Sequence, residues 1–455
     1  MSYPLLLFLI TMFIVSYIFF DGLLSPTVQL VGMFVIGMFS YVVVSPNWSS
    51  DISIKTFFVI TVSLICFTLG EGVSKRVKMR GKKSSGSDLI DYKSLNVFNY
   101  RIKPFWFLVL TALSAVVLVW NFKYTMQLSI AAGNVYGIEY MINFAYYAKT
   151  QLTGMPEEPQ LLTFGLVLSK VFAFYCIFVL ISNIKSKIFL KHLNWMCVLP
   201  IILYICQALL AGGRTQLLRF AIQFIVMFLF INKNMLGKRK PSLKGLIIIA
   251  ALIFCFFAVY KAYGIMRGSM FTDNDYLFAY PASSIQALNV YLDSPTYSHA
   301  FGQETLVTVR GILSKLGFKV ETYPLALEAI SWQNGTTNIY TALRRYIDDY
   351  TFFGSLLIVF ALGFFYGRFE RRVDKSKSLT LLVLYGIMLY PIIEFLFEER
   401  FFIGVISAGT VYEIVFVALL RKIIDKQRKP IGNANSSLSP NQLIQVESRS
   451  VNSFR

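Results

Sequence analysis

The sequence is poor in the residues that build metal sites and disulfide frameworks. Its two histidines, His192 and His299, stand far apart, and its five cysteines all lie inside apolar runs. Cysteines in such runs are typical of small buried residues, and isolated histidines do not predict a metal site. No Walker motif, glycine-rich dinucleotide loop or Ser-His-Asp set is present in the chain. We therefore expect neither a metal nor a cofactor.

Apolar residues are abundant and come in long blocks. They make up 56% of the chain, and the blocks are about 17–25 residues long, which is the length needed to cross a bilayer. This pattern predicts an all-α polytopic membrane protein. The first block follows Met-Ser-Tyr-Pro with no basic segment before it, so we expect a permanent helix rather than a cleaved signal. About eleven spans are expected, at residues 4–20, 25–44, 54–72, 104–120, 161–183, 195–211, 214–231, 245–262, 352–368, 379–397 and 401–420.

Acidic residues are scarce, and the formal net charge is +19. The basic residues gather in five segments that begin at Ser74, Lys185, Lys233, Arg368 and Arg421. Lys and Arg are enriched in cytoplasmic loops, so all five segments are expected to be cytoplasmic. An even number of spans separates successive segments, and this puts the N-terminus outside and the C-terminus inside.

The same topology divides the chain into two parts. Residues 1–430 form the transmembrane domain, and by far its longest outer loop covers residues 263–351. We expect this loop to fold into short helices. Residues 431–455 are polar and rich in Ser and Asn, and we expect them to be a disordered cytoplasmic tail.

The basic residues left on the outer side are mainly arginines. A tight turn, Gly212-Gly213-Arg214, precedes Thr215 at the start of the span at 214–231. A helix N-terminus with nearby glycines and an arginine can bind an anion, because it offers free N–H groups and a fixed charge. The alternative is a plain interhelical turn whose arginine reaches toward the membrane surface.

A second stretch, from Asn334 into the span at 352–368, carries several polar residues immediately outside the membrane. It resembles the C-terminal signature of the Wzy-type O-antigen and capsule repeat-unit polymerases, in which Asn-x-Tyr-Thr is followed by Arg, Tyr, Asp-aromatic and Gly. The departure is Thr351, where that family usually has glycine. The Gly213-Arg214 pair is similar to the Gly-x-Arg turn of the same family. The residues that match in register are Asn338, Tyr340, Thr341, Arg344, Tyr346, Asp349, Tyr350 and Gly354.

The resemblance implies a GT-C-like fold in the bacterial inner membrane and a metal-independent glycosyltransferase activity. Such an enzyme transfers a glycan chain, linked to undecaprenyl pyrophosphate, onto the next lipid-linked repeat unit at the periplasmic face. The product would be the O-antigen of lipopolysaccharide, a capsule or another surface glycan. Expected partners are the lipid-linked oligosaccharide, membrane lipid, and the chain-length regulator and flippase of the same pathway. Nucleic acid is not expected.

That chemistry assigns roles to the outer charged residues. Without a metal, fixed cations must stabilise the leaving pyrophosphate, and a carboxylate must activate the acceptor hydroxyl. Asp349 is the first candidate base because it lies one helical turn beyond Arg344, and Glu398, Glu399 and Asp348 are rivals. The alternative for Arg344 and Asp349 is a surface ion pair of little energetic value. The catalytic candidates are Asp349, Arg344, Arg214 and Glu398. The candidates for substrate binding are Gly213, Arg267, Arg345, Arg400, Asn338, Tyr340, Tyr346 and Glu399.

Two other functions remain open on the sequence. An O-antigen ligase uses the same donor, and only His299 offers the outer histidine that ligases usually have. A lipid-linked oligosaccharide flippase or other transporter is the second alternative, because charges at the membrane midplane are common in transporters. Lys170, Glu394 and Glu413 lie within expected spans, and Lys170 and Glu413 are also candidates for a structural pair.

Overall fold

A computed structural model describes most of the chain. The described residues are 1–20, 22–48, 51–77, 98–138, 140–152, 154–185, 194–211, 215–236, 276–293, 295, 301–321, 323, 327–333 and 335–428. The expected span at 245–262, the tail at 431–455, and the site candidates Gly213, Arg214 and Arg267 lie outside them.

The described residues fold almost entirely into helices. The α-helices are α1 (Ser2–Phe19), α2 (Pro26–Trp48), α3 (Ile54–Arg76), α4 (Pro104–Ala131), α5 (Met141–Gln151), α6 (Gln160–Lys185), α7 (Val198–Leu210), α8 (Thr215–Leu236), α10 (Tyr276–Asp293), α11 (Val307–Lys315), α12 (Ala342–Ser376), α13 (Leu379–Glu394) and α14 (Ala408–Leu420). Short 3-10 or π turns are η2 (Asn194–Cys197), η3 (Phe401–Val405) and η4 (Arg421–Ile423). Two small antiparallel pairs join β1 (Phe98–Ile102) to β4 (Ile424–Arg428) and β2 (Ile330–Trp332) to β3 (Gly335–Thr337).

Seven of these helices are long and apolar enough to cross a membrane: α1, α2, α3, α4, α6, α8 and α12. The shorter helices α7 and α13 are also apolar. The protein is therefore an all-α membrane protein, as the apolar blocks predict. Each expected span that falls within the described residues overlaps one of the helices α1–α4, α6–α8 and α12–α14.

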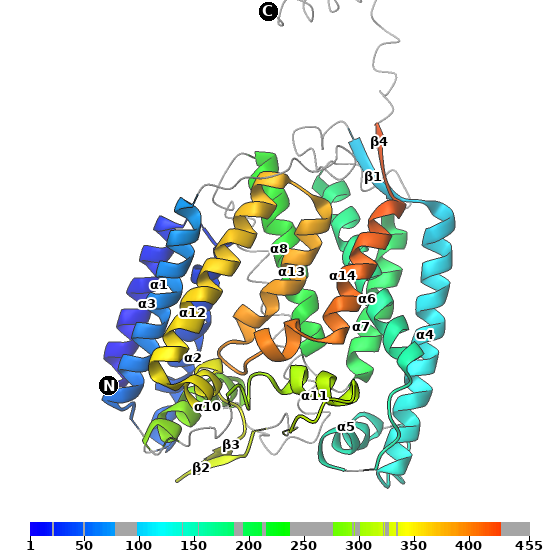
Figure 1. The fold of residues 1–455 in the computed structure, drawn as a ribbon. Helices are drawn as coiled ribbons and strands as arrows, with labels where there is room; N and C mark the ends of the chain where they lie inside the picture. The colour runs from blue at the N-terminus through cyan, green and yellow to red at the C-terminus, as the bar shows by residue number, and fades with distance from the viewer. Residues whose placement is uncertain are drawn as a thin grey trace, which may run out of the picture.

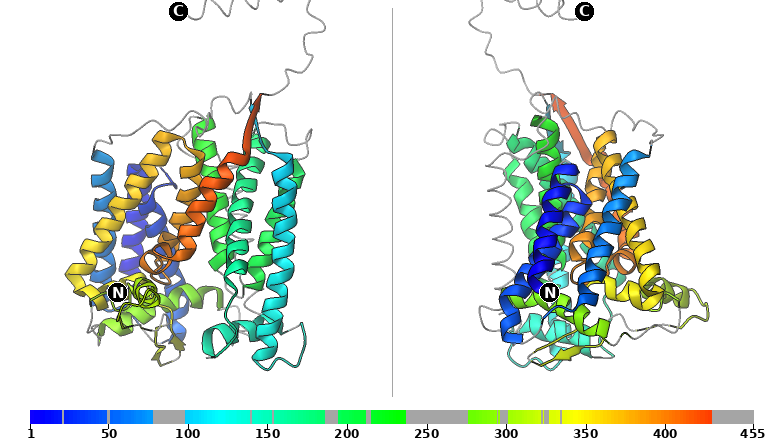
Figure 2. Two further views of the ribbon diagram at one scale, coloured as in Figure 1. Left: turned by 45° about the vertical axis from the view of Figure 1, so that its right-hand side comes forward. Right: turned by 90° about the vertical axis from the view of Figure 1, so that its left-hand side faces the viewer.

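The helices stand side by side, and the two ends of the bundle differ (Figures 1 and 2). The N-terminus lies at the lower end of Figure 1, together with α5, α10, α11 and the β2–β3 hairpin. The β1–β4 pair lies at the upper end. We call these the N-terminal end and the β1–β4 end. The described parts of the segment at 263–351 include α10, α11 and the β2–β3 hairpin, and these lie at the same end as the N-terminus.

Two expected boundaries need correction. Helix α4 continues to Ala131 rather than ending at residue 120, because Tyr124 and Leu128 on its last turns are buried against α5. The expected span at 401–420 is interrupted: η3 covers Phe401–Val405, and α14 begins only at Ala408, after a cap by Ser407. Helix α12 begins at Ala342, and a kink at Thr351 separates its first turns from the part that starts at residue 352, where the expected span also begins.

Helices α3 and α12 pack closely through small residues. A Cβ on Gly363 of α12 would lie 2.1 Å from the backbone oxygen of Phe67, and a Cβ on Gly70 of α3 would lie 2.1 Å from that of Phe360. Each glycine thus lets the facing backbone approach, which is the usual basis of helix association in a membrane. This contact fixes the position of α12, whose first turns carry most of the matched signature.

Candidate functional site

The charged residues of the signature, Arg344 and Asp349, lie in the first turns of α12, at the N-terminal end of the bundle. Residues 342–350 are helical, and Thr351 then adopts φ 60° and ψ 177°, which kinks the helix before it enters the apolar run. The backbone N–H of Ala342 donates to the Phe395 carbonyl at 2.8 Å. This bond ties the start of α12 to the segment that follows α13. The signature therefore lies beside residues 394–400, which are some fifty positions later in the sequence.

Arg344 is held by a carboxylate and two aromatic rings. Its Nη1 contacts both carboxylate oxygens of Glu304, at 2.8 and 2.6 Å. Its guanidinium lies 5.1 Å from the ring centroid of Tyr291 and 4.8 Å from that of Tyr340. Burial raises the pKa of the Glu304 carboxyl, although the charge of Arg344 opposes this shift. Arg344 is only 9% exposed, and it forms a close ion pair with Glu304.

Arg345, the next residue of α12, is only 2% exposed. Its Nη1 donates to the Glu304 backbone oxygen at 3.0 Å, and its Nη2 lies 4.0 Å from Glu398 Oε1. Glu398 Oε2 in turn lies 2.5 Å from Arg400 Nη2, and Arg400 Nε donates to Glu394 at 3.3 Å. Three arginines and three glutamates from α12, the segment before α11 and the segment after α13 thus form one network.

We call this network the arginine cluster, and it consists of Glu304, Arg344, Arg345, Glu394, Glu398 and Arg400. Its formal charges balance. The sequence places Arg344, Arg345, Glu398 and Arg400 in two distant segments, and the structure brings them together. Glu304 is the member that sequence reasoning missed, because it stands in the long loop without a motif around it.

Three further carboxylates near the cluster accept hydrogen bonds from uncharged donors. Asp349 accepts hydrogen bonds from the backbone N–H groups of Glu304 and Thr305, at 3.0 and 2.8 Å, and from the Thr305 hydroxyl at 2.7 Å. Asp348 accepts from the Tyr291 hydroxyl at 2.8 Å. The contacts of Asp349 hold the turn that carries Glu304, so this aspartate fixes where the partner of Arg344 lies.

The third, Glu399, is buried beneath η3. It accepts from the backbone N–H groups of Phe401, Phe402 and Ile403, at 2.7, 2.9 and 3.1 Å, and from the Tyr346 hydroxyl at 3.0 Å. Burial raises the pKa of the Glu399 carboxyl, and these four hydrogen bonds oppose the shift. A carboxylate with this set of donors organises the start of a helical turn. Tyr346 and Glu399, both substrate-binding candidates, are thus bonded to each other in the interior.

The other candidates lie at the edge of this region. Tyr340 forms one wall beside Arg344, and its hydroxyl donates to the Glu328 carbonyl at 3.0 Å. Asn338 is exposed next to the β2–β3 hairpin. Arg214, another catalytic candidate, lies outside the described residues.

A second charged group lies between α6, α8 and α14. Lys170 pairs with Glu413, which confirms the structural pairing considered from the sequence. Arg219 Nη1 also contacts Glu413, at 3.3 Å, and its guanidinium lies 3.9 Å from the ring centroid of Tyr390. Sequence reasoning missed Arg219, although an arginine inside an expected span was a signal. The two cations share one carboxylate, so this group keeps a net positive charge close to the arginine cluster.

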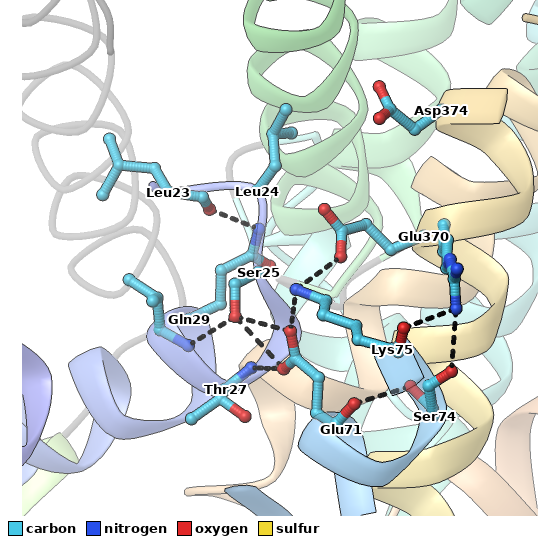
Figure 3. Close-up of polar contacts among 12 residues, drawn as sticks. Leu23, Leu24, Ser25, Thr27, Gln29, Glu71, Ser74, Lys75, Glu370 and Asp374 are labelled. Carbon is cyan, nitrogen blue, oxygen red and sulfur yellow. Dashed lines mark hydrogen bonds and ion pairs between the residues drawn. The ribbon is translucent and has the colours of Figure 1, made fainter. Parts of the chain in front are cut away.

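A third polar group lies where the start of α2, the last turns of α3 and the later part of α12 meet (Figure 3). Glu71 of α3 accepts from the Ser25 hydroxyl at 2.9 Å and from the backbone N–H of Thr27 at 2.8 Å, at the start of α2. Lys75 lies 2.6 Å from Glu71 and 3.1 Å from Glu370 of α12. These contacts join α2, α3 and α12. We interpret this group as structural.

Comparisons with known proteins add no relative. No family model, curated protein or solved structure matches the chain. Among the described residues, no group of three or more His, Cys, Asp or Glu side chains could hold a metal ion. The arginine cluster is the described site best suited to an anion, because guanidinium groups bind phosphate and carboxylate oxygens in a bidentate manner.

Proposed function

We propose that the protein is a polysaccharide polymerase similar to the Wzy type. In this proposal it transfers a glycan from undecaprenyl pyrophosphate to the next lipid-linked repeat unit, at the outer face of the bacterial inner membrane. The observation that carries the proposal is the convergence of Arg344, Arg345 and Arg400 at the end of the bundle that also holds the N-terminus. A flippase and a chain-length regulator would act with it.

In the proposed reaction the arginines bind the pyrophosphate and stabilise the charge that develops as the glycosidic bond breaks. The ligand would have to displace carboxylates that neutralise these arginines in the free protein. Glu304 is suited to be displaced from Arg344, because burial already disfavours its charged form. An arginine fork would then exchange a carboxylate for a phosphate of similar geometry.

We assign the activation of the acceptor hydroxyl to Glu398. Its carboxylate forms ion pairs with Arg345 and Arg400, and its side chain is 29% exposed. When pyrophosphate binds these arginines, Glu398 loses its counter-charges and becomes a stronger base. Asp349 is given a positioning role, since its oxygens are engaged by the 304–305 turn.

The test is a polysaccharide gel on a deletion strain that carries wild-type or variant protein. We expect Arg345→Lys and Glu398→Gln to abolish the ladder, because the first loses the planar fork and the second loses the base. The matched control is the double variant Lys315→Gln/Lys319→Gln, which removes two exposed charges of the same outer loop and should keep the ladder. Protein abundance and thermal stability are measured for each variant.

The deletion strain itself separates the three functions. A single repeat unit on the lipid core supports the polymerase. Bare core with polymer accumulating on the lipid carrier identifies a ligase, and His299→Ala should then lose activity. Absence of repeat units from the outer face identifies a transporter. A full ladder from folded Arg345→Lys and Glu398→Gln proteins would refute the assigned roles even if the polymerase activity stands.

A further inference from the structure

A groove lies between α12, α13 and α14, away from the arginine cluster. Its cavity volume is about 320 Å³, and its walls are mainly apolar. The apolar walls are Phe365 and Phe369 from α12, Leu384 and Met388 from α13, and Ile414 from α14. Such a groove on an apolar helix bundle fits a hydrocarbon chain.

Two arginines also line this groove, Arg368 and Arg372 of α12. They are four residues apart, so they lie on the same face of the helix, one turn from each other. At about 1.5 Å per residue, they lie roughly 12 and 6 Å from the end of α12 at Ser376, whereas Phe365 lies roughly 17 Å from it. The groove is therefore apolar at depth and cationic toward the β1–β4 end.

The acidic residues near these arginines pair with other cations. Glu370 lies 3.1 Å from Lys75, and Asp374 lies 3.2 Å from Lys233. Arg371, between the two groove arginines, donates to the carbonyl oxygens of α3 and Val77. Within the part of the chain that the structure describes, no carboxylate lies within 4.0 Å of Arg368 or Arg372. Two uncompensated guanidinium groups beside an apolar groove match an anionic head group attached to an acyl chain.

We propose that this groove binds one anionic glycerophospholipid of the leaflet at the β1–β4 end. One acyl chain lies along Phe365, Met388 and Ile414, and the phosphate contacts Arg368 and Arg372. With the orientation proposed above, this is the cytoplasmic leaflet. The site is separate from the proposed polymerase site and does not depend on that function.

The experiment uses the full chain, purified in detergent and stripped of lipid. Native mass spectrometry measures the binding of phosphatidylglycerol and of phosphatidylcholine with matched acyl chains. We expect one phosphatidylglycerol to be retained in preference to phosphatidylcholine. The double variant Arg368→Gln/Arg372→Gln should bind phosphatidylglycerol roughly 30-fold more weakly, because it loses two basic residues near the membrane surface. The control Lys375→Gln/Lys422→Gln removes two exposed charges outside the groove and should change binding less than about threefold.

A second variant tests the apolar part. Met388→Trp fills the groove and should weaken both lipids while the thermal stability of the protein is kept. Equal binding of the two lipids by wild type, or equal losses in the arginine and lysine variants, would overturn the proposal. Displacement of phosphatidylglycerol by an equal amount of undecaprenyl phosphate would also overturn the proposal, because it identifies the polyprenyl lipid as the occupant of the groove. A dimer that forms only after lipid removal would overturn it too, because it identifies a second copy of the chain as the occupant.

Discussion

Replacing Thr351 by glycine should stabilise the protein. Thr351 adopts φ 60° and ψ 177°, a region that is open to glycine and costs other residues about 1–3 kcal/mol. Its side chain is exposed, so little packing is lost when it is removed. Glycine has greater backbone freedom in the unfolded chain, which offsets about 0.5–1 kcal/mol of the gain. The expected net gain is about 1 kcal/mol.

The assay is heating in detergent, with the folded fraction followed by size-exclusion chromatography. A gain of about 1 kcal/mol should raise the midpoint by about 1–3 °C, since the shift per kcal/mol falls as proteins become larger. Thr351→Ala is the matched control: alanine keeps the Cβ and therefore the strain, so its midpoint should not rise. If the glycine variant melts at or below the alanine variant, the backbone at this position is not strained and the reasoning fails.

Three other substitutions test the packing and the buried charges. Gly363→Ala should destabilise the protein by about 3 kcal/mol or more, since its Cβ would meet a backbone oxygen of α3. The control Gly72→Ala has open space around it and should be neutral or stabilising. Equal melting temperatures of these two variants would contradict the close packing of α3 and α12. Glu399→Gln should cost about 1–3 kcal/mol, because an amide replaces an oxygen that accepts N–H bonds, and an unchanged melting temperature would argue against this role. Glu413→Gln should lower the stability by about 3–5 kcal/mol, because it leaves Lys170 and Arg219 buried without their carboxylate. Lys170→Met leaves the neutral pair of Arg219 and Glu413 and should lower the stability clearly less. The reverse order of the two variants in a thermal melt would refute this charge balance.

Hydropathy was a good guide to the helices because the hydrocarbon layer demands long apolar segments whatever the fold. It failed where a segment's polarity is satisfied inside the protein. Arg344, Arg345 and Asp348 were placed outside the span, in a loop expected to form short helices, but hydropathy gave no sign of their buried partners Glu304 and Tyr291. It also failed for Phe401–Val405, an apolar run that is a π turn because Glu399 binds its first N–H groups.

Charge type and spacing predicted part of the candidate site. Arg344 and Arg345 could be singled out because arginine is unexpected outside the membrane, and Arg400 for the same reason. Their partner Glu304 could not, because an acidic residue in a long polar loop is ordinary. The pairing of β1 with β4 was equally hidden: strands 98–102 and 424–428 carry no local sign of each other, and only the folded bundle brings them together.

The balanced charge of the arginine cluster has a physical reason that bears on the proposed reaction. Bare guanidinium groups at 2–9% exposure would pay a large desolvation cost, so a buried cationic site needs counter-charges before its ligand arrives. Glu304 supplies one to Arg344, and Glu398 supplies one to Arg345 and Arg400. A pyrophosphate that replaced both would keep the cluster neutral and would free one of the displaced carboxylates next to the reacting sugar. The same ion pairs that stabilise the free protein would then set its specificity, because an uncharged lipid could not release Glu398 from its arginines.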